Sequence, residues 1–299
     1  MKILLLGANG QVGKELTRHL SSVGELIAFA RADLDITNHA AVAQAVADLA
    51  PHIIVNAAAY TGVDKAEDEQ ALAYAINAEA VAHLAQCART AKAWLIHYST
   101  DYVFDGSKSS AYLETDATNP VNVYGASKNA GEEAICEAAS QHLIFRTTWV
   151  IGKDGHNFAK TMLRLACERD ALNVVSDQHG VPTSPSLITS VTIDAVKAIQ
   201  NNAAWPSGIY HLVPDGTSSW HEVAQTLIGF AASQQVALNA QAADIHPIST
   251  ADYPTAARRP MNSQLDTGKL SAHLSFDLPH WKDDFLAVAR DIIEELKAA

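Results

Sequence analysis

The sequence predicts an α/β protein with a doubly wound parallel sheet and a smaller C-terminal lobe. Over the first 150 residues, short apolar or β-branched runs alternate with stretches of helical composition, several of them rich in alanine. A glycine-rich segment directly follows the first of these runs. This alternation is typical of parallel βαβ units, whose helices cover both faces of a sheet.

The first five strands are predicted at the apolar runs, which lie at residues 2–6, 26–30, 52–56, 94–99 and 142–150. Helices are predicted over residues 40–50 and 68–91, where apolar side chains recur at three- and four-residue spacing, and from about Gln11. After about residue 150 the alternation becomes irregular, and prolines at positions 182, 185, 206, 214, 247, 254 and 260 separate shorter elements. There we predict helices over residues 158–169, 220–233 and 281–296 and a strand over 209–213.

Composition excludes several classes of protein. The chain is 48% apolar with a formal charge of −12, which argues against extended contact with nucleic acid or an anionic membrane. It has no apolar run of about 18 residues, and its N-terminal apolar run reaches a glycine too soon for a secretory signal. We therefore expect a cytoplasmic protein in which an anionic substrate would need a local basic pocket.

The cysteines give no sign of a disulfide framework or a zinc site. Cys87, Cys136 and Cys167 are widely spaced without a Cys-x-x-Cys pair, and the histidines form no His-Glu-x-x-His pattern. We expect all three cysteines to be buried as small apolar side chains.

The glycines near the N-terminus predict a nucleotide site. Gly7, Gly10 and Gly13 lie between the first strand and the helix from Gln11, where backbone N–H groups and the helix dipole can face a pyrophosphate. The alternative is a tight turn without a ligand. The placement directly after a first strand favours a Rossmann-type dinucleotide-binding domain over residues 1–150. Residues 151–299 are then mainly a substrate-binding lobe, with segments that return to the first domain.

The end of the second strand bears on the choice of cofactor. A carboxylate there would bind the adenosine ribose, whereas an arginine can pair with a 2′-phosphate, and this chain has Arg31. We therefore expect NADPH to be preferred to NADH. Asp33 or Asp35 could reach the ribose and reverse this preference, and Arg31 could equally be an ordinary surface arginine.

Two further segments are candidates to line the cofactor site. Asp35 and Ile36 can flank the adenine. Ala57, Ala58 and Ala59 follow the third strand, where small side chains leave room for a cofactor to cross the sheet. Close helix packing explains the alanines equally well.

Tyr124 and Lys128 lie four residues apart and share one face of a helix. An ammonium near a phenol favours the ionised phenol, so we expect Lys128 to lower the pKa of Tyr124 from its usual value of about 10 toward neutral. A tyrosine tuned in this way can donate a proton to a developing alkoxide. The alternative is an exposed helix face.

Together with the glycines and the segment at residues 99–104, this pair resembles the extended short-chain dehydrogenase/reductase superfamily. The resemblance implies that Tyr124 is the general acid/base and that Lys128 also holds the nicotinamide ribose. It implies that Thr100 hydrogen-bonds the substrate carbonyl.

Within that superfamily, motifs over nearly the whole chain resemble the dTDP-4-dehydrorhamnose reductases. They lie at residues 56–67, 97–106, 122–125, 145–150 and 259–263. The implied reaction is hydride transfer from NADPH or NADH to C4 of dTDP-4-dehydro-6-deoxy-L-mannose, which gives dTDP-L-rhamnose for cell-surface polysaccharides such as lipopolysaccharide. The resemblance also implies cofactor contacts at Gln11, Val12, Tyr60, Thr61 and Tyr98.

The same resemblance implies that Asp101 and Trp149 contact the sugar, alongside Thr100 and Tyr124. Arg259 is a candidate for the diphosphate because a guanidinium suits phosphate oxygens, although a surface ion pair would also explain it. Glu15 matches a position that helps to bind a metal between subunits in some members. The acidic partner position is Ser186 here, so we make no metal assignment and expect a monomer or a homodimer.

Two alternative functions remain open. One is a reductase, or an epimerase or dehydratase, of another nucleotide sugar, because the cofactor domain is shared while the lobe selects the substrate. Dehydratases of the superfamily carry an Asp-Glu pair after the threonine, whereas Thr100 is followed here by Asp101 and Tyr102, which favours reduction. The other is a nucleotide-binding regulatory subunit without catalysis.

Overall fold

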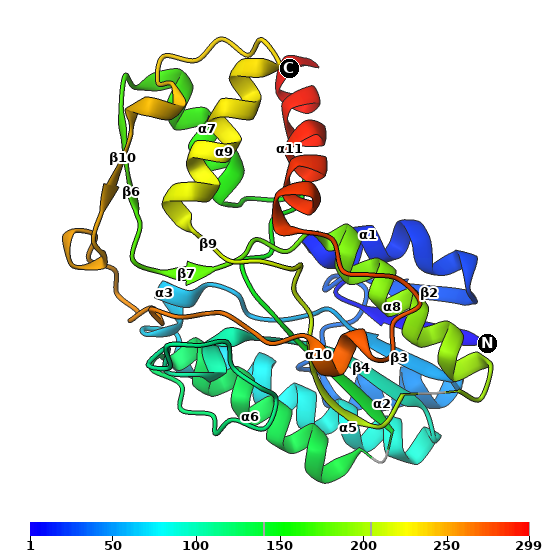
Figure 1. The fold of residues 1–299 in the computed structure, drawn as a ribbon. Helices are drawn as coiled ribbons and strands as arrows, with labels where there is room; N and C mark the ends of the chain where they lie inside the picture. The colour runs from blue at the N-terminus through cyan, green and yellow to red at the C-terminus, as the bar shows by residue number, and fades with distance from the viewer. Residues whose placement is uncertain (140, 204, 299) are drawn as a thin grey trace.

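A six-stranded parallel sheet forms the centre of the lower part of the molecule in Figure 1. The computed structural model describes residues 1–139, 141–203 and 205–298. The strand order is β2-β1-β3-β4-β5-β8, and every neighbouring pair is parallel. The strands are β1 (Lys2–Leu6), β2 (Glu25–Phe29), β3 (Ile53–Asn56), β4 (Trp94–Thr100), β5 (His142–Thr147) and β8 (Gly208–His211). The predicted doubly wound α/β fold is confirmed.

Helices cover both faces of this sheet because its strands are apolar on both sides. In β1, Ile3 and Leu5 pack with α1 (Gln11–His19) and α8 (Pro185–Gln200). The alternate residues Leu4 and Leu6 pack on the opposite face. The helices of that face are α2 (His39–Leu49), α5 (Ala80–Ala91) and α6 (Val123–Ala138). Each buried leucine or isoleucine contributes about 1.5–3 kcal/mol of burial free energy.

Two predicted elements differ from the structure in ways that matter for the site. The helix predicted over 68–91 is interrupted, because α4 (Gln70–Tyr74) and α5 are joined by the π-helical turn η2 (Ala75–Glu79). The strand predicted to reach residue 150 ends at Thr147, since Trp149 takes a left-handed backbone conformation with φ +41°.

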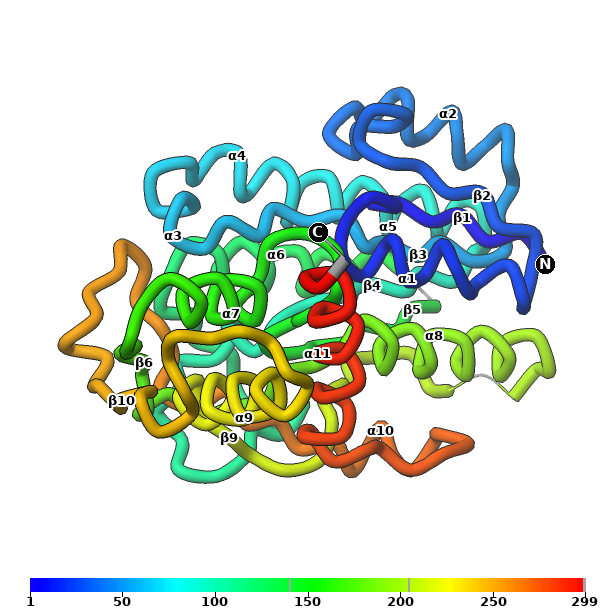
Figure 2. Tube along the Cα trace, turned by 90° about the horizontal axis from the view of Figure 1, so that it is seen from above, coloured from blue at the N-terminus to red at the C-terminus, as the bar shows by residue number. Residues whose placement is uncertain are grey.

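The C-terminal lobe lies above the sheet in Figure 1 and is built around three helices. These are α7 (Phe158–Glu168), α9 (Trp220–Ser233) and α11 (Trp281–Ala298). Figure 2, seen from above, shows the three helices close together, and α9 contacts both α7 and α11. Trp281 and Phe285 are buried among them. Two small sheets complete the lobe, β6 (Leu172–Val175) with β10 (Ile245–Ile248) and β7 (His179–Gly180) with β9 (Ser218–Ser219).

The remaining short elements connect these layers. They are η1 (Leu20–Ser22), α3 (Val63–Ala66), η3 (Asp101–Val103), η4 (Ala242–Asp244), η5 (Thr250–Asp252) and α10 (Gly268–Ser271). In the described part of the chain, we find no helix with the length and apolar character needed to span a membrane.

The chain returns to the sheet after α7, because α8 packs against α1 and β8 pairs with β5. The division at residue 150 into a dinucleotide domain and a substrate lobe remains a prediction. The expectation of three buried cysteines was wrong: Cys136 is exposed, and Cys87 and Cys167 are half-buried. Cys136 follows the buried Ile135 on α6, and its Sγ lies 3.9 Å from His142 Nε2 at the start of β5.

Candidate active site

A cavity opens where the strand order reverses. β1 lies between β2 and β3, so the connections after β1 and β3 run to opposite faces and leave a crevice at the carboxyl ends of the strands. The cavity has a volume of about 190 Å³. It is lined by Gly7, Asn9, Gly10, Arg31, Leu34, Asp35, Ile36, Ala57, Ala58, Ala59 and Ile76. The glycine turn, the segment after β2 and the turn at residues 56–59, called the cofactor turn below, thus meet at one cavity.

The glycine turn has room for no side chain at two positions. Gly7 has φ +82°, and a Cβ there would lie 2.5 Å from the backbone nitrogen of Ala58. A Cβ on Gly13 would lie 2.0 Å from the Gly7 carbonyl oxygen. Gly10 begins α1, and no side chain in the described part of the chain caps its first turn. The first N–H groups of α1 therefore have no side-chain partner among the described residues, as pyrophosphate binding at a helix N-terminus requires.

Several residues predicted to bind the cofactor do not line this cavity. Gln11 turns its side chain toward the C-terminal lobe, where Oε1 accepts from the Gly152 N–H and from Asn157 Nδ2, each at 3.1 Å. Val12 packs against the apolar core on the face of the sheet that α1 and α8 cover. Tyr60 donates its hydroxyl to Glu69 at 2.7 Å, and Thr61 beside it is exposed. Their cofactor contacts remain predictions.

Arg31 lies at the rim of the cavity with 74% of its side chain exposed. Its Nε lies 3.3 Å from Asp35 Oδ2, and hydrogen bonds from Thr37, followed by Arg31, lower the pKa of the Asp35 carboxyl. Asp33 instead accepts from the Ala30 N–H at 2.9 Å. The Asp33 carboxylate is thus hydrogen-bonded within the turn after β2, whereas Arg31 and Asp35 both line the cavity.

Tyr124 lies in the first turn of α6. Asn122 is the N-cap residue that precedes this helix, and its side-chain oxygen accepts from the Gly125 N–H at 2.8 Å. The Tyr124 ring meets the Tyr102 ring edge to face, with 5.7 Å between centroids. Burial raises the pKa of Tyr124 to about 12, a hydrogen bond with Thr100 lowers it, and Asp101 raises it.

The expectation that Lys128 brings the pKa of Tyr124 toward neutral was therefore wrong for this structure. Desolvation of the phenol dominates, and the Lys128 side chain makes its hydrogen bonds to other groups. Lys128 is 2% exposed, and its Nζ donates to the Tyr98 carbonyl at 2.6 Å and lies 3.1 Å from His97 Nε2. Burial lowers the pKa of Lys128 to about 8, while Glu132 raises it.

Tyr98 contributes its carbonyl rather than its hydroxyl to this cluster, because the hydroxyl lies 2.7 Å from Thr192 Oγ1 on α8. Sequence reasoning missed His97 and Asn56 as members of the site. His97 Nδ1 lies 3.1 Å from Asn56 Nδ2, and both side chains are buried. Polar residues within otherwise apolar strands were the available signal, but their contact depends on the strand register.

Asp101 follows Thr100 directly and is 3% exposed. Thr100 Oγ1 donates to Asp101 Oδ1 at 3.1 Å. Burial raises the pKa of Asp101 to about 7, although hydrogen bonds from Ser263 and Thr100 lower it. The carboxyl therefore changes charge near neutral pH, next to the hydroxyl that is proposed to bind the carbonyl.

Trp149 stacks on Trp220, with 3.8 Å between ring centroids and 18° between ring planes. Its left-handed φ of +41° is unfavourable for a bulky residue, and such conformations concentrate at functional sites. A Cβ on Gly180 would lie 2.9 Å from the indole, so that glycine makes room for the ring. Trp220, at the start of α9, was not predicted to take part, and no sequence pattern pointed to it.

Arg259 lies in the segment after β10, beside the Tyr102 ring. Its Nη2 donates to Asp64 Oδ2 at 2.7 Å, and its guanidinium carbon lies 5.9 Å from the Tyr102 ring centre. Nη1 is buried without a hydrogen-bond partner among the described residues. Arg258 is exposed. Of these two neighbouring arginines, Arg259 is the one that lies against the Tyr102 ring.

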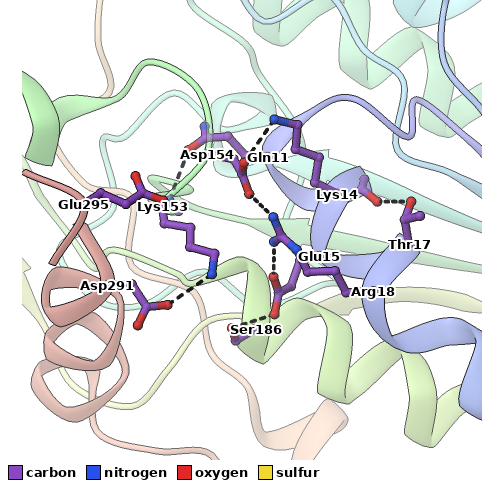
Figure 3. Close-up of polar contacts among 12 residues, drawn as sticks. Gln11, Lys14, Glu15, Thr17, Arg18, Lys153, Asp154, Ser186, Asp291 and Glu295 are labelled. Carbon is purple, nitrogen blue, oxygen red and sulfur yellow. Dashed lines mark hydrogen bonds and ion pairs between the residues drawn. The ribbon is translucent and has the colours of Figure 1, made fainter. Parts of the chain in front are cut away.

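Glu15 lies in a second cluster, which joins α1 to the C-terminal lobe (Figure 3). Its carboxylate accepts from Arg18 at 2.7 Å and from Ser186 Oγ at 3.2 Å, and Asp154 accepts from Lys14 and Arg18. The carboxylates of Glu15 and Asp154 are thus already paired with lysine and arginine side chains, whose positive charge does not suit a bridging cation. Among the described residues, no group of three or more His, Cys, Asp or Glu side chains is placed to hold a metal.

The chain is similar to known proteins along nearly its full length. Residues 1–293 match the family model described as the RmlD substrate binding domain. Proteins named dTDP-4-dehydrorhamnose reductase from Shigella flexneri and Escherichia coli strain K12 are 46% and 47% identical, over 94% of this chain and 95% of each relative. The solved structure of dTDP-4-dehydrorhamnose reductase from Bacillus anthracis in complex with NADP has a TM-score of 0.88 and 35% identity. That comparison covers 97% of this chain and 99% of the other.

Proposed function

This chain belongs to the family described as the RmlD substrate binding domain, and we propose that it reduces dTDP-4-dehydro-6-deoxy-L-mannose to dTDP-L-rhamnose. It is an NAD(P)H-dependent oxidoreductase. The observation that carries the proposed chemistry is the placement of the buried Tyr124 hydroxyl beside Thr100, which ends β4 at the carboxyl edge of the sheet.

The reduced nicotinamide supplies a hydride to C4 when it is bound, and the protein must stabilise the negative charge that develops on the carbonyl oxygen. Tyr124 and Thr100 carry two hydroxyl groups that can both donate to this oxygen once Thr100 turns its proton away from Asp101 Oδ1. The raised pKa of Tyr124 keeps its proton in place at neutral pH. An alkoxide is a much stronger base than a phenolate, so the proton passes to the product oxygen despite that raised pKa.

Lys128 has two roles in this proposal. Its Nζ is buried one helical turn after Tyr124, where it can hold a ribose hydroxyl of the cofactor and return a proton to the phenolate. Its pKa of about 8 suits proton exchange near neutral pH, because the amine and the ammonium are both accessible.

The glycine turn, the cofactor turn, Arg31 and Ile36 are proposed to hold the dinucleotide. The proposal is supported by the shared cavity and by the NADP present in the Bacillus anthracis reductase structure. On an acidic chain, Arg31 supplies the positive charge that a 2′-phosphate needs, so we propose NADPH as the preferred cofactor.

Asp101, Trp149 and Arg259 are proposed to hold the nucleotide sugar, with the segment after residue 150 supplying most of the substrate lobe. The stacked indole of Trp149 offers a flat apolar face to the sugar. Arg259 has one nitrogen free of hydrogen-bond partners among the described residues, which can donate to a diphosphate oxygen.

Tyr124→Phe tests the proposal. The variant should bind NADPH as the wild type does but lose about 10²-fold or more in turnover of the 4-keto sugar generated from dTDP-glucose, measured as loss of NADPH absorbance. Tyr74→Phe, which changes a partly exposed tyrosine on α4, is the matched control. Wild-type turnover in Tyr124→Phe would refute the assigned proton donor.

The alternatives are separated in the same assay. A reductase of another nucleotide sugar would turn over 4-keto sugars carrying a different nucleotide faster, and a regulatory subunit would bind NADPH without turnover of any of them. Lys128→Met should weaken cofactor binding and turnover together, because one amine serves both.

We also propose a cytoplasmic location and a monomeric or homodimeric state. The three cysteines are free in the structure, which suits a reducing compartment. Cell fractionation and light scattering of the purified protein test these two points separately.

A further inference from the structure

His97 connects the cofactor turn to the lysine of the catalytic helix. Its ring is completely buried, with Nδ1 3.1 Å from Asn56 Nδ2 and Nε2 3.1 Å from Lys128 Nζ. Asn56 and His97 are register partners in the parallel pair of β3 and β4, so the sheet itself fixes this contact. Neither side chain has a role in the chemistry described above.

The hydrogen bonds of Asn56 determine which nitrogen of His97 carries the proton. Asn56 Oδ1 accepts from the Ala58 N–H at 3.1 Å, so the amide nitrogen is the atom that faces His97. An amide NH₂ group only donates, and His97 Nδ1 must therefore accept. A neutral imidazole has one proton, which then lies on Nε2 and points at Lys128 Nζ.

This arrangement bears directly on the charge of Lys128. An N–H group pointing at Nζ needs the lone pair of a neutral amine, because an ammonium has donors only. The amine keeps its own protons for the Tyr98 carbonyl at 2.6 Å. The structure is therefore that of the deprotonated lysine, and the ammonium requires a different set of hydrogen bonds.

We propose that His97 is a positioning residue whose tautomer sets the charge of Lys128 and couples that charge to the cofactor turn. When Lys128 becomes an ammonium, Nε2 passes its proton to Nζ and Nδ1 takes one proton from solvent, so the group gains one proton in total. Asn56 must then turn its carbonyl oxygen toward Nδ1 and release the Ala58 N–H. The catalytic role of Lys128 rests on the proposed function. The coupling between the His97 tautomer and the charge of Lys128 does not depend on that function.

The surrounding charges agree with a lysine that titrates near neutral pH. Burial lowers the pKa of Lys128 to about 8, and burial together with the charge of Lys128 keeps the pKa of His97 well below 6.5. Glu132 of α6 acts in the opposite direction on Lys128, but its carboxylate is held by Arg146 of β5 at 2.6 Å. The polar side chains that β3 and α8 contribute here, Asn56 and Thr192, are uncharged and so exert no charge effect on the pKa of Lys128.

The coupling reaches the cofactor because Ala58 lines the cavity. The N–H of Ala58 is held by Asn56 in one charge state of Lys128 and released in the other. By linkage, a cofactor that contacts this turn must shift the proton affinity of Lys128, and the charge of Lys128 must shift cofactor affinity by the same factor.

Ring-nitrogen NMR of the full chain labelled with ¹⁵N-histidine tests the proposal without any turnover. His97→Gln identifies the His97 signals by their loss. Between about pH 6 and 10, the wild-type ring should remain neutral and change from the Nδ1–H to the Nε2–H tautomer, with the same midpoint as the Lys128 side chain. A single tautomer across this range, or a His97 cation at pH 7, would overturn it.

Asn56→Asp provides an independent test with nearly unchanged shape. A carboxylate accepts from both the Ala58 N–H and His97 Nδ1–H, so it fixes the Nδ1–H tautomer and should raise the Lys128 midpoint by about one pH unit or more. Asn173→Asp, on an exposed position of β6, is the matched control and should leave the midpoint unchanged. An unshifted midpoint in folded Asn56→Asp contradicts the coupling. If that variant does not fold, the wild-type titration decides alone.

Discussion

Asp64 holds the segment that carries Arg259 at two points. Its Oδ2 accepts from Arg259 Nη2 at 2.7 Å, and its Oδ1 accepts from the Ala257 N–H at 3.1 Å. Asp64 lies on α3, shortly after the cofactor turn, whereas Arg259 lies far along the chain, between η5 and α10. The carboxylate therefore orients the guanidinium while leaving Nη1 unpaired among the described residues.

Arg259→Met should reduce kcat/KM for the nucleotide sugar by about 10- to 100-fold, the scale of a lost hydrogen bond between charged groups. The dissociation constant of NADPH should not change. Arg258→Met removes an exposed neighbouring charge and is the control. Asp64→Asn should produce part of the same loss by freeing the guanidinium. Equal effects of the two arginine variants would contradict the assignment of Arg259.

Arg31→Ala should reduce the preference for NADPH over NADH, measured as the ratio of the two kcat/KM values. An exposed pair contributes about 0.2–1 kcal/mol and a bidentate phosphate contact contributes more, so the wild-type ratio should lie between several-fold and roughly a hundredfold. Arg89→Ala, at an exposed site on α5, controls for net charge. A wild type that favours NADH, or a ratio unaffected by Arg31→Ala, would show that Arg31 does not contact the phosphate.

The pair of Arg146 and Glu132 joins β5 to α6 in the interior, with side chains 3% and 2% exposed. Arg146→Met should lower the free energy of unfolding by about 3–5 kcal/mol, because it leaves a buried carboxylate unpaired. The double variant Arg146→Met/Glu132→Gln should recover much of this loss, as urea denaturation can measure. Arg164→Met breaks an exposed pair with Glu168 and should cost less than about 1 kcal/mol. Additive losses in the double variant would argue against coupling.

Asp101 should make stability depend on pH. Its pKa rises from 3.8 in the unfolded chain to about 7 in the folded protein, so the folded state binds more protons between these values. The stabilisation of the folded state by protonated Asp101 is fully present below about pH 4 and is lost as the pH rises through 7. At about 1.4 kcal/mol per unit, the full shift amounts to on the order of 4 kcal/mol.

Asp101→Asn removes this titration. Its Tm should exceed that of the wild type at pH 8, and the difference should shrink as the pH falls toward 4. The same variant should turn over the substrate more slowly, because Asp101 contacts Thr100. An identical pH dependence of Tm in the two proteins would show that Asp101 ionises normally.

The sequence predicted the strands of the sheet and the glycine turn well, because short apolar runs that alternate with helical stretches and closely spaced glycines leave a local signature. It missed α8, since Pro185 was interpreted as a break between elements. Proline is favourable at the first position of a helix, and Ser184 caps this helix by accepting from the Leu187 N–H. The Ser-Pro pair was therefore a helix start that could have been recognised.

Other features had no local signature. The contact between Asn56 and His97 depends on strand register, and the stacking of Trp149 on Trp220 joins the segment after β5 to the start of α9. The position of Tyr124 and Lys128 one turn apart on a helix was predicted from their spacing, but the predicted lowering of the Tyr124 pKa was wrong. Spacing places two side chains on one face without revealing how strongly each is desolvated.

The position of β8 at the edge of the sheet has a consequence for synthesis of the chain on the ribosome. β5 is complete at Thr147, yet its outer edge is paired only after β8, which ends at His211, has emerged. Until then a strand whose residues are all buried in the finished protein presents unpaired backbone groups, the condition under which nascent chains associate with one another. A fragment that stops at residue 150 should for this reason aggregate, whereas a fragment extended past β8 and its connection should remain dispersed.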